Sequence, residues 1–327
     1  MERVHRGLSD GGAGGTVLLQ PSAVPATTGA GARLRRLALG AAVPYWQAAP
    51  LALVFAFFFV LPLVVTVVVS LWRYNEYSIT PALVGDNYAS VFFGCLAELP
   101  SLCLTFKTYL STLKFCVLAW VLTLLLGFTV AYFLAFHVRS LTGQMTLFLV
   151  CTIPFWTSNV IRMISWVPLL GRNGLVNTFL ISAGLTREPF TWLLFSDFSV
   201  VLAFVHLYTM FMIVPIFNSM SRIDRALLEA ARDAGASGWQ ALWNVVVPLS
   251  KPGIVIGSIF VVTMVMGDYV TIGVMGGQQI ASAGKVIQVQ LSYLQFPLAA
   301  ANAVVLLAVV LMVIAAMTRL VDVRKEL

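Results

Sequence analysis

The chain has 327 residues, of which 60% are hydrophobic and only 10% are charged, and its mean hydropathy is +0.93. An average soluble domain is about 25% charged, so this composition excludes an ordinary soluble protein and indicates that the bilayer is the solvent. The net charge of +7 is interpreted as loop charge that orients a membrane protein, and no nucleic-acid partner is expected.

The first 43 residues are rich in Gly, Ala, Ser and Thr and carry scattered Arg. A signal peptide would place its apolar core nearer to Met1 and would end at a small-residue cleavage site. Residues 1–43 are therefore predicted to form a disordered cytosolic tail. Residues 44–327 are predicted to form the membrane domain, whose first helix is an uncleaved anchor.

Six apolar stretches follow at a regular pitch. Each has roughly the 20 residues that a helix needs to cross about 30 Å of hydrocarbon, and a helix satisfies its own backbone groups there. The predicted fold is an all-α polytopic membrane protein with six transmembrane helices, near 48–71, 108–136, 145–168, 198–220, 252–275 and 297–319.

The distribution of Lys and Arg predicts the orientation. With both termini in the cytosol, the outer side carries only Arg73, Lys107, Arg172, Arg187 and Lys285. The cytosolic side then carries Arg3, Arg6, Arg33, Arg35, Arg36, Arg139, Arg222, Arg225, Arg232, Lys251, Arg319, Arg324 and Lys325. The positive-inside rule therefore places both termini and the polar loop 221–251 in the cytosol.

The predicted first outer loop, 72–107, contains two of the four cysteines. Cys95 and Cys103 lie in an oxidising compartment and form a candidate disulfide, with two unpaired thiols as the alternative. Cys116 and Cys151 fall within predicted helices and are expected to be packing residues. No spacing typical of zinc ligands is present, and no bound metal is expected.

The second outer loop and the fifth apolar stretch are both irregular. Glycines and short apolar pieces in the loop 169–197 fit one or two short interfacial helices. The charge-free part of the fifth stretch covers only 252–267, and it is followed by Asp268 and several glycines. A membrane helix interrupted in this way borders a cavity rather than lipid.

The polar loop is predicted to be a helical hairpin. Asp224 can cap a helix that begins at Arg225, and Gly235 offers the left-handed conformation that closes it. Ser237 followed by Gln240 has capping-box spacing and starts a second helix. Pro248 and Pro252 are expected to mark the entry to the next membrane helix.

Small and aromatic side chains give the hairpin two distinct faces. Ala230 and Ala231 are small enough for the first helix to lie close in a groove of a partner. Trp239 and Trp243 share one face of the second helix and are expected to anchor it against the transmembrane bundle. The alternative is an amphipathic loop that lies on the membrane surface without a partner.

The stretch EAARDAGASGWQALWNVVVPL resembles the EAA loop of ABC-importer permeases. That pattern is E-A-A, three residues, Gly, nine residues, Ile, one residue and Leu-Pro. It matches in register at Glu229, Ala230, Ala231, Gly235 and Pro248, with Val245 and Val247 in place of the Ile and the Leu.

A second stretch points to one branch of that family. PFWTSNVIR, from Pro154 to Arg162, with Gly174 and Asn177 downstream, is similar to the spermidine/putrescine permeases, as is LLEAARDAGAS. The resemblance covers about 50–320. The long outer loop and Asp268 depart from the pattern of the branch, and this leaves the exact solute open.

The resemblance implies a type I ABC-importer permease (MetI-like) architecture in a bacterial inner membrane. Such a permease binds no cofactor and is not an enzyme, because ATP and Mg are bound by a partner ATPase dimer in the cytosol. A second permease subunit, expected to be a paralogue, and an extracytoplasmic binding protein complete the complex. By the resemblance, the residues that couple to the ATPase are Glu229, Ala230, Ala231, Asp233, Gly235 and Ala236.

The solute pathway is predicted from side-chain chemistry. A polyamine is a long polycation with apolar methylenes, so it suits carboxylates and aromatic faces. The candidates are Trp156, Asn159, Arg162, Trp166, Asp268 and Tyr269. The alternatives are that the aromatic residues are packing, that Asp268 pairs with Arg162 or Lys114, and that His206 is a hydrogen-bonded core residue rather than a proton relay.

Other functions remain open at this point. The same permease role could serve another small solute, such as a phosphonate or an opine. A stand-alone secondary transporter or channel should show internal repeats or several buried charges, and neither is evident. An intramembrane enzyme needs paired aspartates, a Ser–His pair or an HExxH motif, and none is visible.

Overall fold

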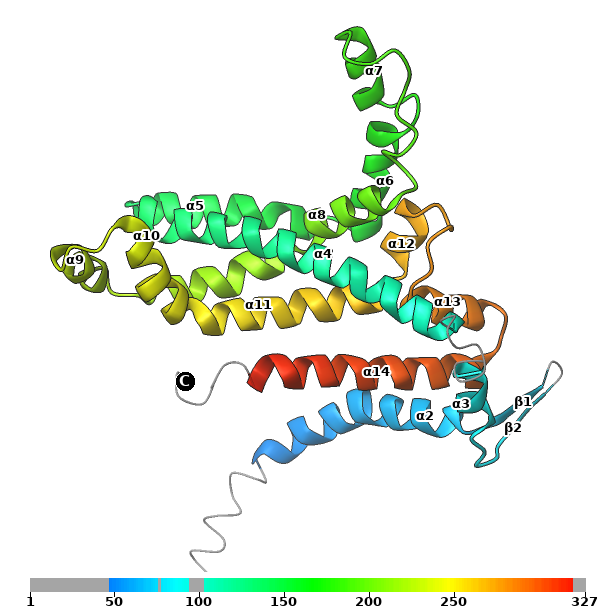
Figure 1. Cartoon of the computed structure of the whole chain (residues 1–327). Coiled ribbons are helices and arrows are strands. Elements are labelled where there is room, and N and C mark those ends of the chain that lie inside the picture. The colour runs from blue at the N-terminus through cyan, green and yellow to red at the C-terminus, as the bar shows by residue number, and fades with distance from the viewer. Residues whose placement is uncertain (1–46, 76–77, 94–102, 320–327) are drawn as a thin grey trace, which may run out of the picture. The chain divides into compact units, whose positions relative to one another are not determined.

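The computed structural model describes residues 47–75, 78–93 and 103–319 of the chain (Figure 1). The predicted tail 1–43 and Cys95 lie outside these ranges, so neither the tail nor the Cys95–Cys103 bridge is tested. The chain divides into two compact units, Met1–Leu61 and Pro62–Leu327. The described part of the first unit is helical and includes the π-helical turn η1 (Ala56–Val60), which has no buried residue.

The remaining described elements are mostly helical. In chain order they are α2 (Leu61–Ser70), β1 (Arg73–Asn75), β2 (Ser78–Thr80), α3 (Asp86–Val91), α4 (Leu104–Tyr132), η2 (Phe133–His137), α5 (Leu141–Thr152), η3 (Ile153–Trp156), α6 (Asn159–Leu170), α7 (Leu175–Ser182), α8 (Asp197–Met220), α9 (Arg225–Asp233), α10 (Gly238–Ala241), η4 (Leu242–Val246), α11 (Val247–Gly267), α12 (Val270–Met275), α13 (Ala283–Ser292) and α14 (Phe296–Arg319).

Long apolar helices confirm the predicted membrane fold. Among the described residues, five helices are long and apolar enough to cross a bilayer, and a sixth span results if one bent pair of helices counts as one. The five are Gln47–Ser70, Leu104–His137, Asp197–Met220, Gly238–Gly267 and Phe296–Arg319. With the bent pair counted as one span, the described residues hold the six spans that the sequence predicts, although two of them differ in detail.

The third span is broken, and the prediction of one continuous helix over 145–168 is wrong. Leu141–Trp156 and Asn159–Ser182 meet at an angle of 87°. Pro154 has no amide to donate, so the chain tightens into the 3-10 turn η3 and the helix stops. The next residue, Thr157, is extended, and its hydroxyl donates back to the carbonyl of Pro154 at 2.8 Å.

The fifth span covers Gly238–Gly267, so it begins before the predicted range 252–275 and also ends before the end of that range. Pro248 lies in the first turn of α11, as predicted, but Pro252 lies inside that helix, and the span continues back to Gly238 through the π-helical turn η4. Pro248 follows this turn, so its missing amide falls where the hydrogen-bond pattern changes from i→i+5 to i→i+4. The helix ends before Asp268, and α12 begins again at Val270.

The helix α8 packs against both α4 and α11, which also contact each other, and these three helices form the core of the second unit. Its inward side chains are buried, among them Phe204, Met212 and Ile216. Glycines allow the neighbours to approach closely, since a Cβ at Gly127 of α4 would lie 2.8 Å from the Cγ of Met212. Such small-residue contacts are how helices pack where lipid gives no hydrophobic driving force.

The two predicted outer loops carry short elements. Strands β1 and β2 form an antiparallel hairpin in which Tyr74 pairs with Ile79, a small departure from an all-α chain. The side chain of Asn87 on α3 ties this loop to α2 by donating to the carbonyls of Ser70 and Trp72, both at 2.8 Å. The short helix expected in the loop 169–197 is present as α7.

Candidate functional site

The polar hairpin has the local structure that its sequence predicts. The Asp224 carboxylate accepts from the amide of Ala226 at 2.9 Å and caps α9, which begins at Arg225. Gly235 has φ +84°, the left-handed conformation that closes the helix. Ser237 and Gln240 form a reciprocal capping box at the start of α10.

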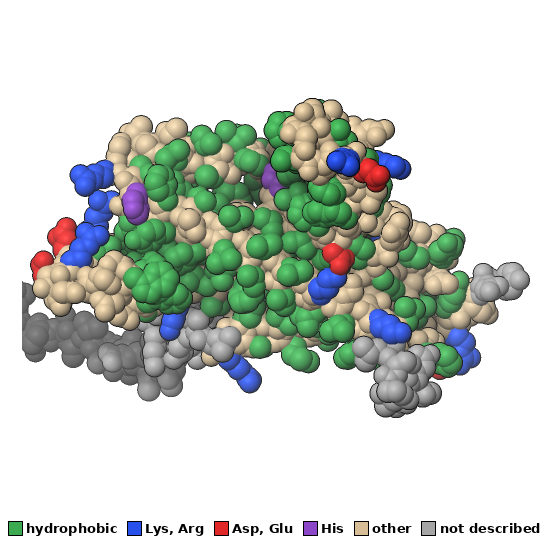
Figure 2. Space-filling view, turned by 45° about the horizontal axis from the view of Figure 1, so that its top comes forward, with side chains coloured by type: hydrophobic (Ala, Val, Ile, Leu, Met, Phe, Trp, Pro, Cys, Tyr) green, Lys and Arg blue, Asp and Glu red, His purple; other side chains and the backbone are tan. Residues whose placement is uncertain are grey.

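The residues of the EAA-like motif lie on a free surface of the chain. Glu229, Ala230, Asp233 and Gly235 are exposed, whereas Ala231 and Ala236 are half-buried. Helix α9 lies at one end of the second unit (Figure 1), and charged side chains gather over that end while hydrophobic ones cover the flank (Figure 2). The hairpin is therefore a polar, accessible element at the end of an apolar bundle.

The expectation that two tryptophans anchor the second helix against the bundle is wrong. Trp239 is 68% exposed and Trp243 is 52% exposed. Their rings contact each other edge-to-face, with centroids 5.6 Å apart. The i, i+4 spacing correctly predicts a shared face, but the bundle side of this helix is taken by the buried Ala241 and Val246.

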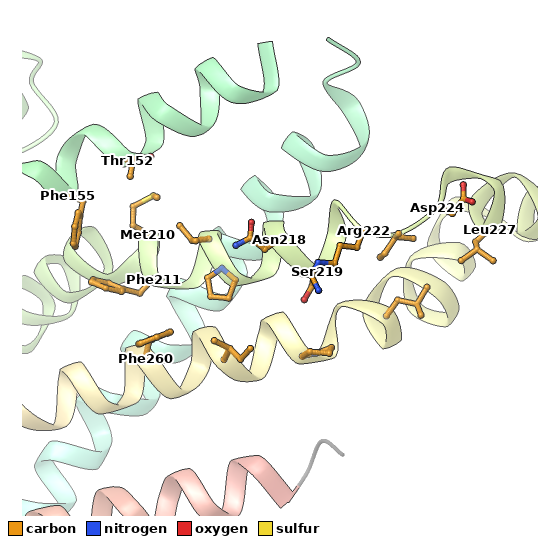
Figure 3. Close-up of a pocket in the computed structure, with 16 residues that line it drawn as sticks. Thr152, Phe155, Met210, Phe211, Asn218, Ser219, Arg222, Asp224, Leu227 and Phe260 are labelled. Carbon is orange, nitrogen blue, oxygen red and sulfur yellow. The ribbon is translucent and has the colours of Figure 1, made fainter. Parts of the chain in front are cut away.

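An apolar groove leads from the hairpin into the bundle (Figure 3). Its cavity volume is about 960 Å³. Five segments line it: the end of α5 with η3, one side of α8, the turn between α8 and α9, the first turn of α9, and one side of α11. The lining residues are Thr152, Phe155, Met210, Phe211, Val214, Pro215, Asn218, Ser219, Arg222, Ile223, Asp224, Leu227, Leu249, Pro252, Ile256 and Phe260.

The two ends of the groove differ in chemistry. Phe155, Phe211 and Phe260 come from three different segments and meet at one end (Figure 3), with ring centroids 5.5 Å and 6.3 Å apart. Polar and charged side chains, including Arg222 and Asp224, stand at the hairpin end. Sequence reasoning missed this groove, because no motif or spacing predicts that these three rings come together.

Asp268 is bound within the chain. Its carboxylate accepts from the Tyr208 hydroxyl at 2.6 Å, from the Thr271 hydroxyl at 2.5 Å and from the Thr271 amide at 2.8 Å. Asp268 precedes Tyr269, the N-cap residue of α12, and its side chain holds an amide in the first turn of that helix. The carboxylate therefore joins α8 to the break in the fifth span.

The expected pairing of Asp268 with Arg162 or Lys114 is wrong. Lys114 on α4 instead forms an ion pair with Asp197 at the start of α8. Arg162 lies in the first turn of α6, is 9% exposed and donates to the side chain of Asn159. Its Nε is buried and has no hydrogen-bond partner among the residues that the structure describes.

The remaining predicted pathway residues are scattered. Trp166 donates from its indole nitrogen to Nδ1 of His206 at 3.0 Å. His206 is therefore hydrogen-bonded as predicted, but it is exposed and not a core residue. Trp156 and Tyr269 are exposed, the first beside the break in the third span and the second beside the break in the fifth. None of the six predicted pathway residues lines the groove, although Trp156 follows its lining residue Phe155.

No metal site is evident in the described part of the chain, where no group of three or more His, Cys, Asp or Glu residues is placed to hold an ion.

Comparison with solved structures shows the fold. The chain superposes on a crystal structure of a bacterial alginate ABC transporter, which was solved in complex with an alginate pentasaccharide-bound periplasmic protein. The TM-score is 0.68 over 87% of this chain and 95% of that one, at 16% sequence identity. At this identity the likeness shows the fold alone, which this chain shares with a chain of that transporter structure.

Sequence relatives narrow the class to a family. The spermidine/putrescine transport system permease protein PotB of Salmonella typhimurium is 34% identical over 204 residues, which cover 62% of this chain and 70% of PotB. The inner membrane ABC transporter permease protein YdcU of Escherichia coli is 28% identical over 257 residues, covering 74% of this chain and 78% of YdcU. No family model matches the chain.

The chain therefore belongs to the PotB family of ABC transporter permeases. It is a multi-pass protein of the inner membrane and a transport subunit rather than an enzyme.

Proposed function

We propose that this chain forms part of the membrane pathway of an ATP-driven importer whose solute is a polyamine of the spermidine/putrescine kind. The relative that is 34% identical is named as a spermidine/putrescine transport permease. The observation that carries the proposal is the groove, which offers three aromatic rings at one end and apolar walls along its length. Aromatic faces attract cations, and apolar walls suit methylene chains.

The groove would serve as this subunit's part of the pathway. Phe155, Phe211 and Phe260 would contact the ammonium groups at the end away from the hairpin, and Asn218 and Asp224 would meet the solute near the hairpin. This assignment replaces none of the six pathway residues predicted from the sequence. Those residues stay candidates for the part of the pathway beyond the aromatic rings.

The hairpin is proposed to couple the pathway to an ATPase. The exposed Glu229, Ala230, Asp233 and Gly235, with the half-buried Ala231 and Ala236, present a short capped helix to a partner. The partner is a cytosolic ABC ATPase dimer, which would bind the ATP and Mg, so this chain needs no cofactor. ATP-driven closure would move α9 and shift the permease between two states, as in any two-state coupling between distant sites.

Two further partners complete the proposed complex. An extracytoplasmic binding protein would deliver the solute at the end opposite the hairpin. A second permease subunit, a paralogue of this chain, would supply the other wall of the pathway. Both termini would lie in the cytosol, as the distribution of Lys and Arg predicts.

The test is uptake by the reconstituted complex. Purified ATPase, both permeases and the binding protein are assembled in proteoliposomes, and ATP-dependent entry of labelled spermidine is measured. Unlabelled spermidine and putrescine are expected to compete, whereas a phosphonate and an opine are not. Phe211→Ala is expected to raise the KM for spermidine, while Phe198→Ala, an exposed ring outside the groove, serves as the matched control.

A second candidate solute is an anionic one, such as a phosphonate or an opine. Arg162 favours it, because a buried guanidinium without a carboxylate partner suits an anion better than a polycation. Competition by these anions, with no competition by putrescine, would replace the first candidate by the second.

A further inference from the structure

Two lysines lie on one face of α4, within its first three turns. Lys107 and Lys114 are seven residues apart and Ser111 lies between them, so the three side chains follow the i, i+4, i+7 spacing of one helix face. They border a hollow of about 460 Å³, called here the lysine hollow. The residues that line it are Lys107, Leu110, Ser111, Leu113, Lys114 and Val117. All of them belong to α4, so the hollow lies on the surface of this helix and not inside the bundle.

The lysine hollow lies where a membrane helix meets the headgroups. Helix α4 begins at the end of the second unit that is opposite α9 (Figure 1). The continuous helix Leu104–His137 has 34 residues. At 1.5 Å per residue it is about 51 Å long, whereas a bilayer with its headgroups measures about 40–45 Å. Its first turns therefore cross a headgroup layer, and the two lysines, about 10 Å apart along the axis, span the roughly 5–8 Å of that layer.

The polar groups of the lysine hollow are only partly satisfied within the chain. Lys114 forms an ion pair with Asp197, whereas the side chain of Lys107 has no ion pair or hydrogen bond with a described residue. The hydroxyl of Thr108 donates to the carbonyl four residues before it at 2.9 Å, but the hydroxyl of Ser111 has no partner in the described part of the chain. An ammonium group and a hydroxyl are therefore left to bind something outside the chain.

The charge and the apolar surface of the lysine hollow fit one kind of ligand. Two lysines and the carboxylate of Asp197 leave one net positive charge. A phosphodiester carries one negative charge, and its oxygens accept from ammonium and hydroxyl donors. The leucines and the valine that line the hollow are exposed. A soluble anion would leave this apolar surface uncovered, whereas an uncharged lipid would leave the ammonium group of Lys107 without a counter-charge.

We infer that the lysine hollow binds an anionic phospholipid of the phosphatidylglycerol kind. The phosphodiester would lie between Lys107 and Lys114 and accept from the hydroxyl of Ser111, while an acyl chain would follow the apolar side chains toward Val117. The ion pair with Asp197 would keep Lys114 in place for this contact. Lysine suits the role because its apolar stem can lie against the acyl chain while its ammonium group reaches the headgroup.

The experiment identifies the lipid that touches the lysine hollow in the assembled importer. The complex is reconstituted in vesicles of equal parts phosphatidylglycerol and phosphatidylcholine, whose acyl chains differ in isotopic mass. Leu110 is replaced by p-benzoylphenylalanine, and Leu125, an exposed residue of α4 outside the hollow, receives the same group as a control. After irradiation, mass spectrometry of the modified peptide gives the ratio of the two lipid adducts.

The expected ratio follows from the charge of one lysine. Anionic lipid is attracted to a lysine near the membrane surface strongly enough for a preference of about five-fold. The phosphatidylglycerol adduct is therefore expected to exceed the phosphatidylcholine adduct by about five-fold at position 110, and the two adducts are expected to be equal at position 125.

Charge variants test the role of the lysine itself. Lys107→Gln is expected to remove the preference at position 110, whereas Lys107→Arg is expected to keep it because the positive charge remains. Lys107 is exposed, so neither change disturbs packing, and gel filtration of the complex checks assembly. Lys251→Gln, which removes an exposed lysine of α11, is the matched control and is expected to leave the preference unchanged.

Three results would overturn the inference. Equal adducts of the two lipids at position 110, or a preference that persists in Lys107→Gln, would show that no anionic lipid is selected by this charge. An adduct with a protein subunit in place of lipid would show that protein covers the hollow. Loss of the preference when inorganic phosphate is added, to the level of Lys107→Gln, would assign the hollow to a soluble anion.

Discussion

Replacing Gly253 with alanine would push a methyl group of α11 into the backbone of α8. A Cβ at this position would lie 2.4 Å from the carbonyl oxygen of Pro215 and 2.9 Å from the Cα of Ile216. Backbone atoms in a packed helix cannot rotate aside, so the two helices must separate. One turn further on, a Cβ at Gly257 would meet the Sδ of Met212 at 2.8 Å, which is able to move, and its nearest backbone atom, the Cα of Met212, is farther away at 3.2 Å.

The size of the effect follows from this difference. Overpacking of a well-packed interior costs about 1–3 kcal/mol. Gly253→Ala is expected at the upper end of that range and Gly257→Ala at the lower end. Gly267 on the same helix is the matched control, because no atom lies within 4 Å of a Cβ there. Gly267→Ala is expected to be neutral, or stabilising by up to about 1 kcal/mol through lower backbone entropy in the unfolded chain.

The assay is thermal unfolding of the purified permease complex, followed by fluorescence-detected gel filtration. With about 2–4 °C per kcal/mol for a chain of this size, a cost of about 3 kcal/mol for Gly253→Ala is expected to lower the melting temperature by about 6–12 °C. Gly253→Ala is expected to have the lowest melting temperature and Gly257→Ala the next lowest. The native chain and the Gly267→Ala variant are expected to melt highest. Equal values for Gly253→Ala and Gly267→Ala would refute close packing of α8 against α11 at this glycine.

Three further predictions concern the site. Glu229→Lys, and Gly235→Leu with its strained left-handed backbone, are expected to uncouple ATP hydrolysis from uptake in inserted protein, and unchanged uptake by both variants would exclude the coupling role. Asp268→Asn is expected to destabilise the chain by about 1–3 kcal/mol, because an amide cannot accept from all three donors that the carboxylate now binds; a raised KM for spermidine at unchanged stability would instead make Asp268 a pathway residue. For the Cys95–Cys103 bridge, the unreduced peptide that contains both cysteines is expected to be two hydrogens lighter than the same peptide after reduction. Alkylation of both thiols without prior reduction would contradict the bridge.

Local signals in the sequence were enough for the hairpin. Asp224, Gly235 and the Ser237–Gln240 box act on backbone atoms within four residues of themselves, so their effects do not depend on the rest of the fold. The same holds for the number of spans, because hydropathy is summed over a window shorter than one helix. These parts of the prediction are confirmed.

Breaks within the spans were predicted less well. The glycines and Asp268 indicated the interruption of the fifth span, but the helix persists through Pro248 and Pro252 by way of a π-helical turn. Pro154 alone could not predict the 87° bend of the third span, since the same residue type leaves the fifth span continuous. Whether a proline breaks a helix depends on what is available to bind the groups that it frees.

The sequence by itself determined that this chain crosses the membrane about six times, carries a capped polar hairpin and resembles ABC-importer permeases. Only the tertiary structure decided that Phe155, Phe211 and Phe260 share one groove, that Asp268 binds Tyr208, and that Lys114 pairs with Asp197. The physical reason is the range of each interaction. Caps and hydropathy are set by neighbours in the chain, whereas a groove or an ion pair is set by which faces of distant helices meet.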